Sequence, residues 1–524
     1  MGKKIIAYDL GTSSVKAALY ESDGAPVMDV DNSYNTYFPQ IGWHEQRPLD
    51  WWDTIIKCTH QLMNLSGADP ESIECMALSS HSMGVVPVDD RGALLRDKTP
   101  IWSDMRAREQ TRRFFEKISL NDWYMKSGSS IPGSYAVFKI MWYMDNEPDM
   151  IKKTYKILGT KDFINLKLTG RFLTDNSYAS GSGVYDLKTN NYSPELIKIS
   201  GIDERLLPDI VPSTHVVGEL TGESAQALGL PKKIKVICGG VDNSCMALGA
   251  KGIKEGRVYT NIGSSAWIAI TSSRPILDTK CYPNIFAHVI PGMYNSGVTI
   301  FSSGSAFRWV RDVVCSDLVK SGAATGTTTG GAQSDATAGM NPYDLMTELA
   351  ARSPVGANKL IFYPTMAMAS PLDSSVNTRG AFTGLDLKHT REDVIRATLE
   401  GVTMSLGWYL DELRRSYAFT DQMLLVGGGS NSSFWRQLFA DIYNMDIIKT
   451  NIGQSAGALG AAALAAVGAG LWSSFDVIDQ LHEIVDITKP IPENHAKYEK
   501  LMNIFKFTAG CQAAIGDKLQ ELQL

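Results

Sequence analysis

An acidic residue followed by a short turn of small residues stands close to the N-terminus of the chain. Asp9 follows an apolar run, and Gly11, Thr12 and Ser13 come next, with Lys16 shortly after them. A tight turn of glycine and small hydroxyl residues exposes backbone N–H groups that can surround phosphate oxygens. Asp9, at the end of a strand, could hold Mg²⁺ directly or through water, because hard cations prefer oxygen ligands. The alternative is an ordinary hairpin turn, in which the same residue types are common.

A second turn of the same kind lies about half the chain away. Gly263, Ser264 and Ser265 separate two apolar runs, as the small residues after Asp9 do in the first unit. This turn would offer a second set of donors, so that a triphosphate could be contacted from two sides. Two such turns in matching contexts favour a phosphate site built from both halves of the chain.

A third segment could place a carboxylate beside those turns. Gly239 and Gly240 end an apolar strand and lead into Asp242 and Asn243, at the start of a helix of small residues. The helix dipole favours a negative charge at this position. An N-cap aspartate without catalytic duty explains the same position, so both interpretations stay open.

A fourth segment is a run of three glycines. Gly427, Gly428 and Gly429 are followed by Ser430 and Asn431 and open a predicted helix. Glycines let a flat ligand lie against the backbone, which predicts an adenine or ribose site. Glycine-rich turns from strand to helix are also frequent in α/β proteins without such a ligand.

Alternating strands and helices must position these segments. Residues 3–20 predict one β-hairpin, and residues 257–271 predict another. The remaining expectations are helices at 49–64, 136–145, 162–168 and 434–443, and strands at 73–79, 235–238 and 423–426. Such alternation predicts an α/β architecture, and the repeated hairpin suggests two domains built on one plan. We place the boundary near residues 246–256, which gives domains 1–250 and 251–524.

The length and composition of the chain limit its number of domains, its binding partners and its cellular location. A chain of 524 residues is too long for one compact core. Its net charge of -6 provides no general basic field, so nucleic acid is not an expected partner. The seven cysteines are odd in number and form no CxxC pair, which indicates neither a disulfide framework nor a zinc site. This pattern favours a reducing, cytoplasmic location.

Two low-complexity stretches need an interpretation. Residues 453–472 are long enough for a membrane span, but alanine and glycine dominate them. They predict a closely packed helix inside a domain, so no membrane partner is expected. Residues 321–339 are rich in Gly, Thr, Ala and Ser and predict a mobile loop, either a tolerated surface insertion or a lid.

Taken together, these segments resemble the FGGY family of carbohydrate kinases over nearly the whole chain. The downstream signature of that family is matched, and the upstream signature is nearly matched, with Lys139 in place and Ala136 as a departure. Other segments look like those of xylulokinase-like members. The matching segments are residues 42–46, 51–52, 101–106, 134–142, 380–385, 393–394 and 397–400.

The resemblance implies two actin-like (ribonuclease H-like) α/β domains with a central cleft that holds ATP, Mg²⁺ and a sugar. It implies that Asp242 is the catalytic base and a magnesium ligand, and that Asp9 is a second magnesium ligand. It also implies that Asp104 and Asn243 face the sugar. The residues it assigns to the nucleotide and its phosphates are Gly11, Thr12, Ser13, Lys16, Gly263, Ser264, Ser265, Gly304, Gly428, Gly429 and Ser430.

The sugar side departs from the xylulokinase pattern. Those enzymes usually carry Gly-Gln-Met-His-Gly where residues 80–84 here read Ser-His-Ser-Met-Gly, so the histidine stands two positions earlier. We assign His81, Ser82 and Met83 to the sugar pocket, with a solvent-facing or packed His81 as the alternative. Residues 366–369 read Met-Ala-Met-Ala where many members have Gly-Glu-Arg.

The sequence therefore predicts ATP-dependent phosphorylation of a sugar hydroxyl. A ketopentose such as xylulose is the favoured acceptor, and another ketose, a polyol, gluconate or an autoinducer-like sugar derivative is the alternative. An actin-like ATPase without sugar kinase activity would share the hairpins, but not the family signatures. A homodimer is left open.

Overall fold

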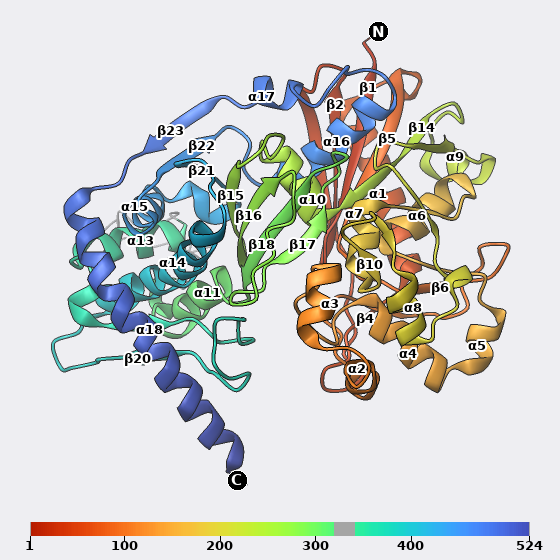
Figure 1. Cartoon of the computed structure of the whole chain (residues 1–524). Coiled ribbons are helices and arrows are strands. Elements are labelled where there is room, and N and C mark those ends of the chain that lie inside the picture. The colour runs from red at the N-terminus through yellow and green to blue at the C-terminus, as the bar shows by residue number, and fades with distance from the viewer. Residues whose placement is uncertain (1, 319–340, 523–524) are drawn as a thin grey trace, which may run out of the picture.

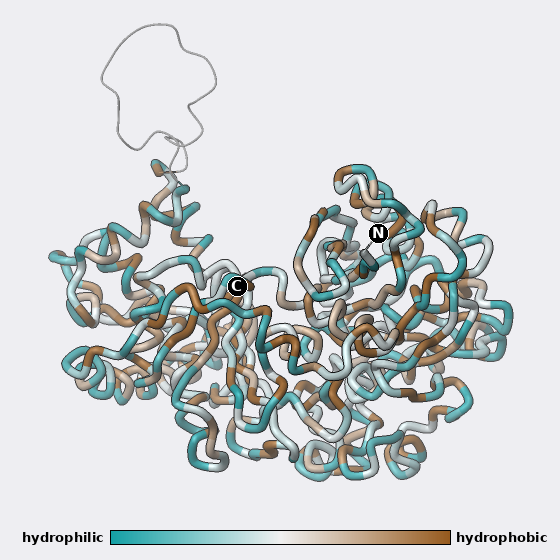
Figure 2. The backbone as a smooth tube through the Cα atoms, turned by 90° about the horizontal axis from the view of Figure 1, so that it is seen from above, coloured by the Kyte–Doolittle hydropathy of each residue, from teal (hydrophilic) through white to brown (hydrophobic). Residues whose placement is uncertain are grey.

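Two mixed β-sheets organise the computed structural model, which describes residues 2–318 and 341–522. Each sheet belongs to one of two lobes that lie side by side (Figure 1), and the same lobes are seen from above in Figure 2. The first sheet has the order β13-β14-β5-β1-β2-β3, with β1 (Lys4–Leu10), β2 (Ser14–Glu21), β3 (Pro26–Ser33), β5 (Ile73–Ser80), β13 (Val216–Glu219) and β14 (Lys235–Val241). The second has the order β17-β18-β16-β15-β21-β22-β23, with β15 (Val258–Ile262), β16 (Ala266–Ser272), β17 (Asn284–Ala287), β18 (Tyr294–Ile300), β21 (Gln422–Val426), β22 (Asp446–Thr450) and β23 (Ile484–Thr488).

The two sheets share one topological plan. In the first, β1 pairs antiparallel with β2 and parallel with β5, and β5 pairs parallel with β14. In the second, β15 pairs antiparallel with β16 and parallel with β21, and β21 pairs parallel with β22. Both predicted hairpins are confirmed, and so is the two-domain α/β fold built on one repeated plan.

Helices surround the sheets. Those of the first lobe are α1 (Pro48–Ser66), α2 (Arg108–Phe115), α3 (Leu120–Ser127), α4 (Ala136–Asn146), α5 (Pro148–Lys153), α6 (Thr160–Thr169), α7 (Asn176–Ala179), α8 (Pro194–Ser200), α9 (Gly222–Leu228) and α10 (Asp242–Gly249). Those that follow are α11 (Gly304–Val313), α13 (Pro342–Arg352), α14 (Arg391–Ser416), α15 (Ser433–Tyr443), α16 (Ala456–Gly468), α17 (Val477–Leu481) and α18 (Pro492–Glu521). Short strand pairs complete the fold: β4 (Glu45–Gln46) with β7 (Thr99–Pro100), β6 (Val86–Val88) with β8 (Lys156–Leu158), β9 (Leu173–Asp175) with β12 (Asp209–Val211), β10 (Tyr185–Asp186) with β11 (Asn191–Tyr192), and β19 (Ile361–Tyr363) with β20 (Ala381–Thr383).

The alternation of side chains along β1 decides which way its acidic residue points. Ile6 and Tyr8 pack in one core with α1 and α6, whereas Ile5 and Ala7 pack in another with α10 and α16. Successive residues of a strand face opposite sides of the sheet, so Asp9 shares the face of Ile5 and Ala7. Asp9 therefore lies on the side of the sheet that α10 and α16 cover.

Helix α16 joins the two halves of the chain. It comes late in the sequence, yet it lies against the strands of the first sheet (Figure 1) and packs on Ile5 and Ala7. It crosses α10 through glycines: a Cβ on Gly460 would stand 1.9 Å from the carbonyl oxygen of Cys245, and one on Gly249 would stand 1.8 Å from that of Ala456. The small side chains of this segment thus allow a close helix crossing, and the prediction of a packed helix is confirmed.

Three further predictions concern membrane-spanning helices, the cysteines and residues 321–339. None of the helices in the described parts of the chain is long and apolar enough to cross a membrane. The cysteines, all of them in the described residues, are free, and Cys511 is the exposed one. The loop expected at residues 321–339 lies outside the described residues.

Candidate active site

The two hydroxyl-rich turns connect antiparallel strands at corresponding places in the two sheets. Gly11 donates a backbone hydrogen bond across the β1–β2 turn at 3.0 Å, and Thr12 and Ser13 are exposed. Gly263 does the same across the β15–β16 turn at 2.9 Å, and Ser264 is exposed. Each turn is closed by its own hydrogen bond, and its tip is left accessible.

The parallel strands place the other segments at the same edges. Asp9, the residues after Ser80 and Asp242 lie at the carboxyl ends of β1, β5 and β14. In the second sheet, Gly263 and Gly427 follow the carboxyl ends of β15 and β21. In α/β sheets, ligands bind in the crevice outside the carboxyl ends of parallel strands. The fold thus gathers the predicted site segments at one edge of each sheet.

A cavity of about 610 Å³ lies against the second turn, and it is within the usual size range of small-molecule sites. The predicted nucleotide-binding residues that line it are Gly263, Ser264, Gly304, Gly428 and Gly429. Gly304 approaches the turn so closely that a Cβ there would stand 2.5 Å from the carbonyl oxygen of Gly263. A glycine is therefore required where α11 begins.

Other residues that were predicted for the nucleotide site do not line this cavity. Ser430 is 1% exposed, and its hydroxyl donates to the carbonyl oxygen of Gly427 at 2.7 Å, so it stabilises the glycine turn. Lys16 lies opposite Asp9 in the β1–β2 pair, but its ammonium group pairs with Asp29 at 3.2 Å. The structure thus directs the Lys16 charge towards β3. Ser265 is half-buried, and its carbonyl oxygen accepts the hydrogen bond that closes the second turn.

The cavity also contains residues that the sequence analysis did not single out. They come from α10, α11, α13 and the loops around them, and only their common surroundings identify them. They are Met246, Phe307, Asn341, Tyr343, Asp344, Thr347 and Gln454; Arg308, Asn431 and Trp435 line the same cavity. Met246 links the cavity to the acidic residue at the start of its own helix, because both belong to α10.

Asp242 is the first residue of α10, and the N-cap position belongs to Val241. The alternative that Asp242 is only an N-cap aspartate is therefore wrong. Its carboxylate accepts the backbone N–H of the half-buried Asn243 at 2.7 Å. Burial, and then the negative charge of Asp9, raise the pKa of Asp242 to about 7. A carboxylate with such a pKa is suited to accept a proton near neutral pH.

Asp9 is surrounded by polar and small groups. The hydroxyl of Ser79 donates to its Oδ1 at 2.7 Å, and burial raises the pKa of Asp9 above its ordinary value. Helix α16 begins beside it, since a Cβ on Gly457 would stand 2.6 Å from its Oδ2. Asp9 and Asp242, remote in sequence, thus influence each other electrostatically on one face of the first sheet.

The sugar-side histidine is packed in the interior. His81 is 1% exposed, and its ring meets that of Trp51 edge-on at 5.5 Å between centroids. The solvent-facing alternative is therefore wrong. Burial lowers the pKa of His81 to about 4, and its Nε2 has no hydrogen-bond partner among the described residues. Ser82 and Met83 are each 7% exposed, and Met83 has a left-handed φ of 62°.

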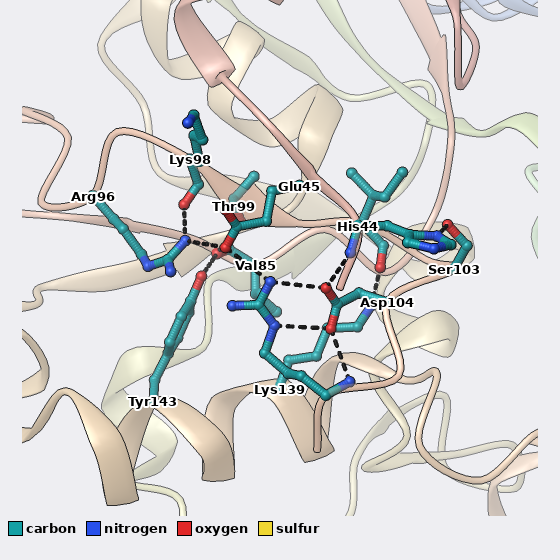
Figure 3. Close-up of polar contacts among 12 residues, drawn as sticks. His44, Glu45, Val85, Arg96, Lys98, Thr99, Ser103, Asp104, Lys139 and Tyr143 are labelled. Atoms are coloured by element: carbon teal, nitrogen blue, oxygen red, sulfur yellow. Dashed lines mark hydrogen bonds and ion pairs between the residues drawn. The ribbon is translucent and has the colours of Figure 1, made fainter. Parts of the chain in front are cut away.

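Asp104 lies in a buried ion-pair cluster (Figure 3). Its carboxylate accepts the backbone N–H of His44 at 2.6 Å and the guanidinium of Arg106 at 2.8 and 2.9 Å. Arg106 also pairs with Glu45 at 2.8 Å. Asp104 is 0% exposed, so the structure surrounds it with donors of the protein itself. These contacts connect Asp104 with His44 and Arg106, and a contact of Asp104 with the sugar stays a prediction.

The loop that contains Asp104 is tied to the rest of the site. The indole Nε1 of Trp102 donates to the hydroxyl of Thr12 in the first turn at 3.0 Å. The ammonium group of Lys139 donates to the carbonyl oxygens of Met83 at 3.0 Å and Ile101 at 2.7 Å. These bonds connect residues 81–83, residues 101–106 and the first hydroxyl-rich turn into one polar assembly.

The fold and the cavity define a two-lobed protein with matching turns in its two sheets and a carboxylate pair at the strand ends of the first sheet, as expected for a phosphotransferase. The FGGY family model for the N-terminal domain of carbohydrate kinases matches residues 4–249, and the model for the C-terminal domain matches residues 258–469. The chain belongs to the FGGY family of carbohydrate kinases, which use ATP as the phosphate donor. The alternative of an actin-like ATPase without kinase activity is set aside.

The relatives carry two different sugar names. A xylulose kinase of Staphylococcus xylosus is 27% identical over 507 residues, which cover 96% of this chain and 99% of the relative. A gluconokinase of Bacillus subtilis (strain 168) is 28% identical over 514 residues, which cover 96% and 95%. The crystal structure of a ligand-bound xylulose kinase from Lactobacillus acidophilus superposes with a TM-score of 0.88 at 25% identity, and covers 99% of this chain and 100% of that one.

Proposed function

We propose that this kinase transfers the terminal phosphoryl group of ATP to a hydroxyl of a neutral ketopentose such as xylulose. The nucleotide occupies the 610 Å³ cavity, with its phosphates directed to the turns at residues 11–13 and 263–265. The division into domains 1–250 and 251–524 then corresponds to an acceptor side and a nucleotide side. Residues that line the cavity, including Gly304 and Gly428, support this assignment.

Asp242 is the proposed catalytic base. It accepts the proton of the attacking hydroxyl, while backbone donors of the two turns stabilise negative charge on the transferred group. The raised pKa supports this role, because a base works best when its pKa is near the operating pH. The position of Met246 on the same helix supports a short path between acceptor and cavity.

Asp9 and Asp242 would hold a magnesium ion together with the phosphates. The donor set fits, because Mg²⁺ in kinases is bound through one or two carboxylates plus phosphate oxygens. The described residues contain no cluster of three or more acidic, histidine or cysteine side chains that could hold the ion alone. When bound, Mg²⁺ would neutralise charge on the phosphates.

We choose a neutral acceptor because of the charged side chains near residues 81–83 and 101–106. Gluconate has a carboxylate and would need an available cation. In the assembly of residues 81–83, residues 101–106 and α4, Arg106 is paired with two carboxylates, and its guanidinium lies 3.9 Å from the centroid of the Trp43 ring. Lys139 is 0% exposed and bonded to two carbonyl oxygens, and His81 is neutral.

A coupled assay of ADP release tests this proposal. Purified protein with ATP and Mg²⁺ is given xylulose, gluconate, other ketoses or polyols, and one sample receives no sugar. We expect kcat/KM for xylulose to exceed that for gluconate by at least about tenfold, since an unpaired buried carboxylate is strongly rejected. A preference for gluconate would contradict the proposed acceptor, and equal ADP release without sugar would contradict sugar phosphorylation by this site.

A further inference from the structure

The strand that leads to Asp242 is irregular just before it ends. The pairing register between β14 and β5 shifts between Ile237 and Gly240. Gly239 has a φ of 76°, and a Cβ there would stand 2.1 Å from the carbonyl oxygen of Leu78. A bulge of this kind re-aims the residues that follow it. Contacts from outside the sheet therefore add to the pairing of Gly240 and Val241 with β5 in holding the strand end before Asp242.

One such contact comes from a buried serine. The backbone N–H of Val241, the residue before Asp242, donates to Ser177 Oγ at 2.9 Å. The Ser177 hydroxyl in turn donates to Asp175 Oδ2 at 2.5 Å. Ser177 and Asp175 are both 0% exposed. A side chain of α7 thus accepts the backbone N–H of the residue before Asp242, in addition to the pairing of that residue with Ser80 of β5.

Further contacts hold the Asp175 carboxylate, which accepts the hydrogen bond from that hydroxyl. The ammonium group of Lys161 pairs with Asp175 at 2.9 Å and with Asp162 at 2.6 Å, and all three groups are almost completely buried. Ser213 donates to the same Asp175 Oδ2 at 2.6 Å. Because buried charges are costly unless paired, the carboxylate of Asp175 has little freedom to move.

The other side of Asp242 is held by the second lobe. The carbonyl oxygen of Asn243 accepts the side-chain amide of Asn295 at 3.0 Å and the hydroxyl of Tyr259 at 3.3 Å. The N–H of Val241 and the carbonyl oxygen of Asn243, one residue to each side of Asp242, are therefore bonded to buried side chains of the first and the second lobe respectively. This arrangement fixes where the α10 terminus stands between the lobes.

We infer that Ser177, supported by Asp175 and Lys161, is a positioning residue that sets the location of the Asp242 carboxylate through the Val241 N–H. The inference rests on the proposed role of Asp242. Ser177 touches the backbone beside the base, and it takes no part in the chemistry. Its contribution is geometric, because small displacements of a catalytic group cost large factors in rate.

Ser213 provides a matched control. Ser177→Ala and Ser213→Ala each remove one buried hydroxyl donor to Asp175, but only Ser177→Ala removes the acceptor of the Val241 N–H. We expect Ser177→Ala to lower kcat by roughly 10- to 100-fold with KM for ATP unchanged. Ser213→Ala should keep kcat within about threefold. Ser177→Cys, close in volume but a weak acceptor, should give an intermediate kcat and serves if the alanine variant fails to fold.

The decisive measurement combines Ser177→Ala with Asp242→Asn. If Ser177 acts through Asp242, adding Ser177→Ala to Asp242→Asn lowers kcat no further. Equal kcat for Ser177→Ala and Ser213→Ala, or the same additional loss in the double variant as in the single one, would overturn the inference. Near-normal kcat for Asp242→Asn alone would overturn the proposed base instead.

Discussion

At the scale of single residues, the proposed mechanism depends on the Asp242 carboxylate, whose surroundings raise its pKa. Asp242 is half-buried at the start of α10, and the charge of Asp9 adds to the effect of burial on its pKa. The cavity lining, in contrast, begins one helical turn later at Met246. Loss of the carboxylate should therefore affect proton transfer much more than nucleotide binding.

Asp242→Asn is expected to lower kcat by roughly 10²- to 10⁴-fold, the usual contribution of general base catalysis, with KM for ATP little changed. Steady-state ADP release with varied ATP and sugar measures both quantities. The exposed Asp90, changed to Asn, serves as the control for loss of an acidic residue. Turnover of Asp242→Asn close to that of the control would exclude Asp242 as the base.

At the scale of elements, the crossing of α10 and α16 depends on glycine. The backbone of α16 passes so close to α10 that even one methyl group on Gly460 would meet the carbonyl oxygen of Cys245 at 1.9 Å. Helix α10 carries Asp242 at its start, and α16 begins beside Asp9. This crossing therefore determines how the two carboxylates stand relative to the second lobe.

Gly460→Ala is expected to reduce the free energy of unfolding by about 1–3 kcal/mol, because the added methyl group must push the helices apart. Gly510→Ala is the matched control, since this glycine is exposed inside α18 and a Cβ there meets nothing within 4 Å. The control should gain roughly 0.5–1 kcal/mol from helix propensity. Urea unfolding followed by circular dichroism compares the two variants, and a Gly460→Ala protein as stable as the control would contradict the packing described.

At the scale of the whole molecule, three buried histidines make the free energy of unfolding depend on pH. Burial lowers the pKa of His81 to about 4, of His288 to about 3 and of His482 to about 4. The two ring nitrogens of His482 contact Thr450 Oγ1 at 2.9 Å and the carbonyl oxygen of Gly249 at 2.8 Å. The folded protein thus favours the neutral rings, while the unfolded chain protonates them near pH 6.5.

Above pH 6.5 the three histidines are neutral in both states, and their contribution to the free energy of unfolding is fully present. This contribution is lost as the pH falls from 6.5 towards 4, because the unfolded state then binds more protons than the folded state. His81 and His482 each contribute at most roughly 3 kcal/mol, and His288, with its lower pKa, at most roughly 5 kcal/mol. The free energy of unfolding, measured by urea titration between pH 7.5 and 5, should decrease on acidification. His482→Gln should reduce that slope, and an unchanged or rising stability below pH 6.5 would contradict the prediction.

Much of the local structure could be predicted from the sequence. The hairpins that became β1–β2 and β15–β16, and helices such as α1 and α15, follow from apolar periodicity and turn residues within a few positions of each other. The same local signals gave the glycine-rich turns and the carboxylate after β14. The domain plan was visible because one hairpin pattern occurs twice. Such features depend on neighbours in the chain, which the sequence lists directly.

The remaining features depend on contacts between distant segments. Tyr343, Thr347 and Gln454 line the cavity, and nothing in their local sequence marks them. Asp104 belongs to a motif, yet its burial against Arg106 follows from how residues 44–46 fold over it. The sequence by itself determined the strands, the turns and the presence of an acidic residue directly after β14. Only the tertiary structure decided which polar groups are buried, paired or available, because burial and pairing arise when remote elements pack together.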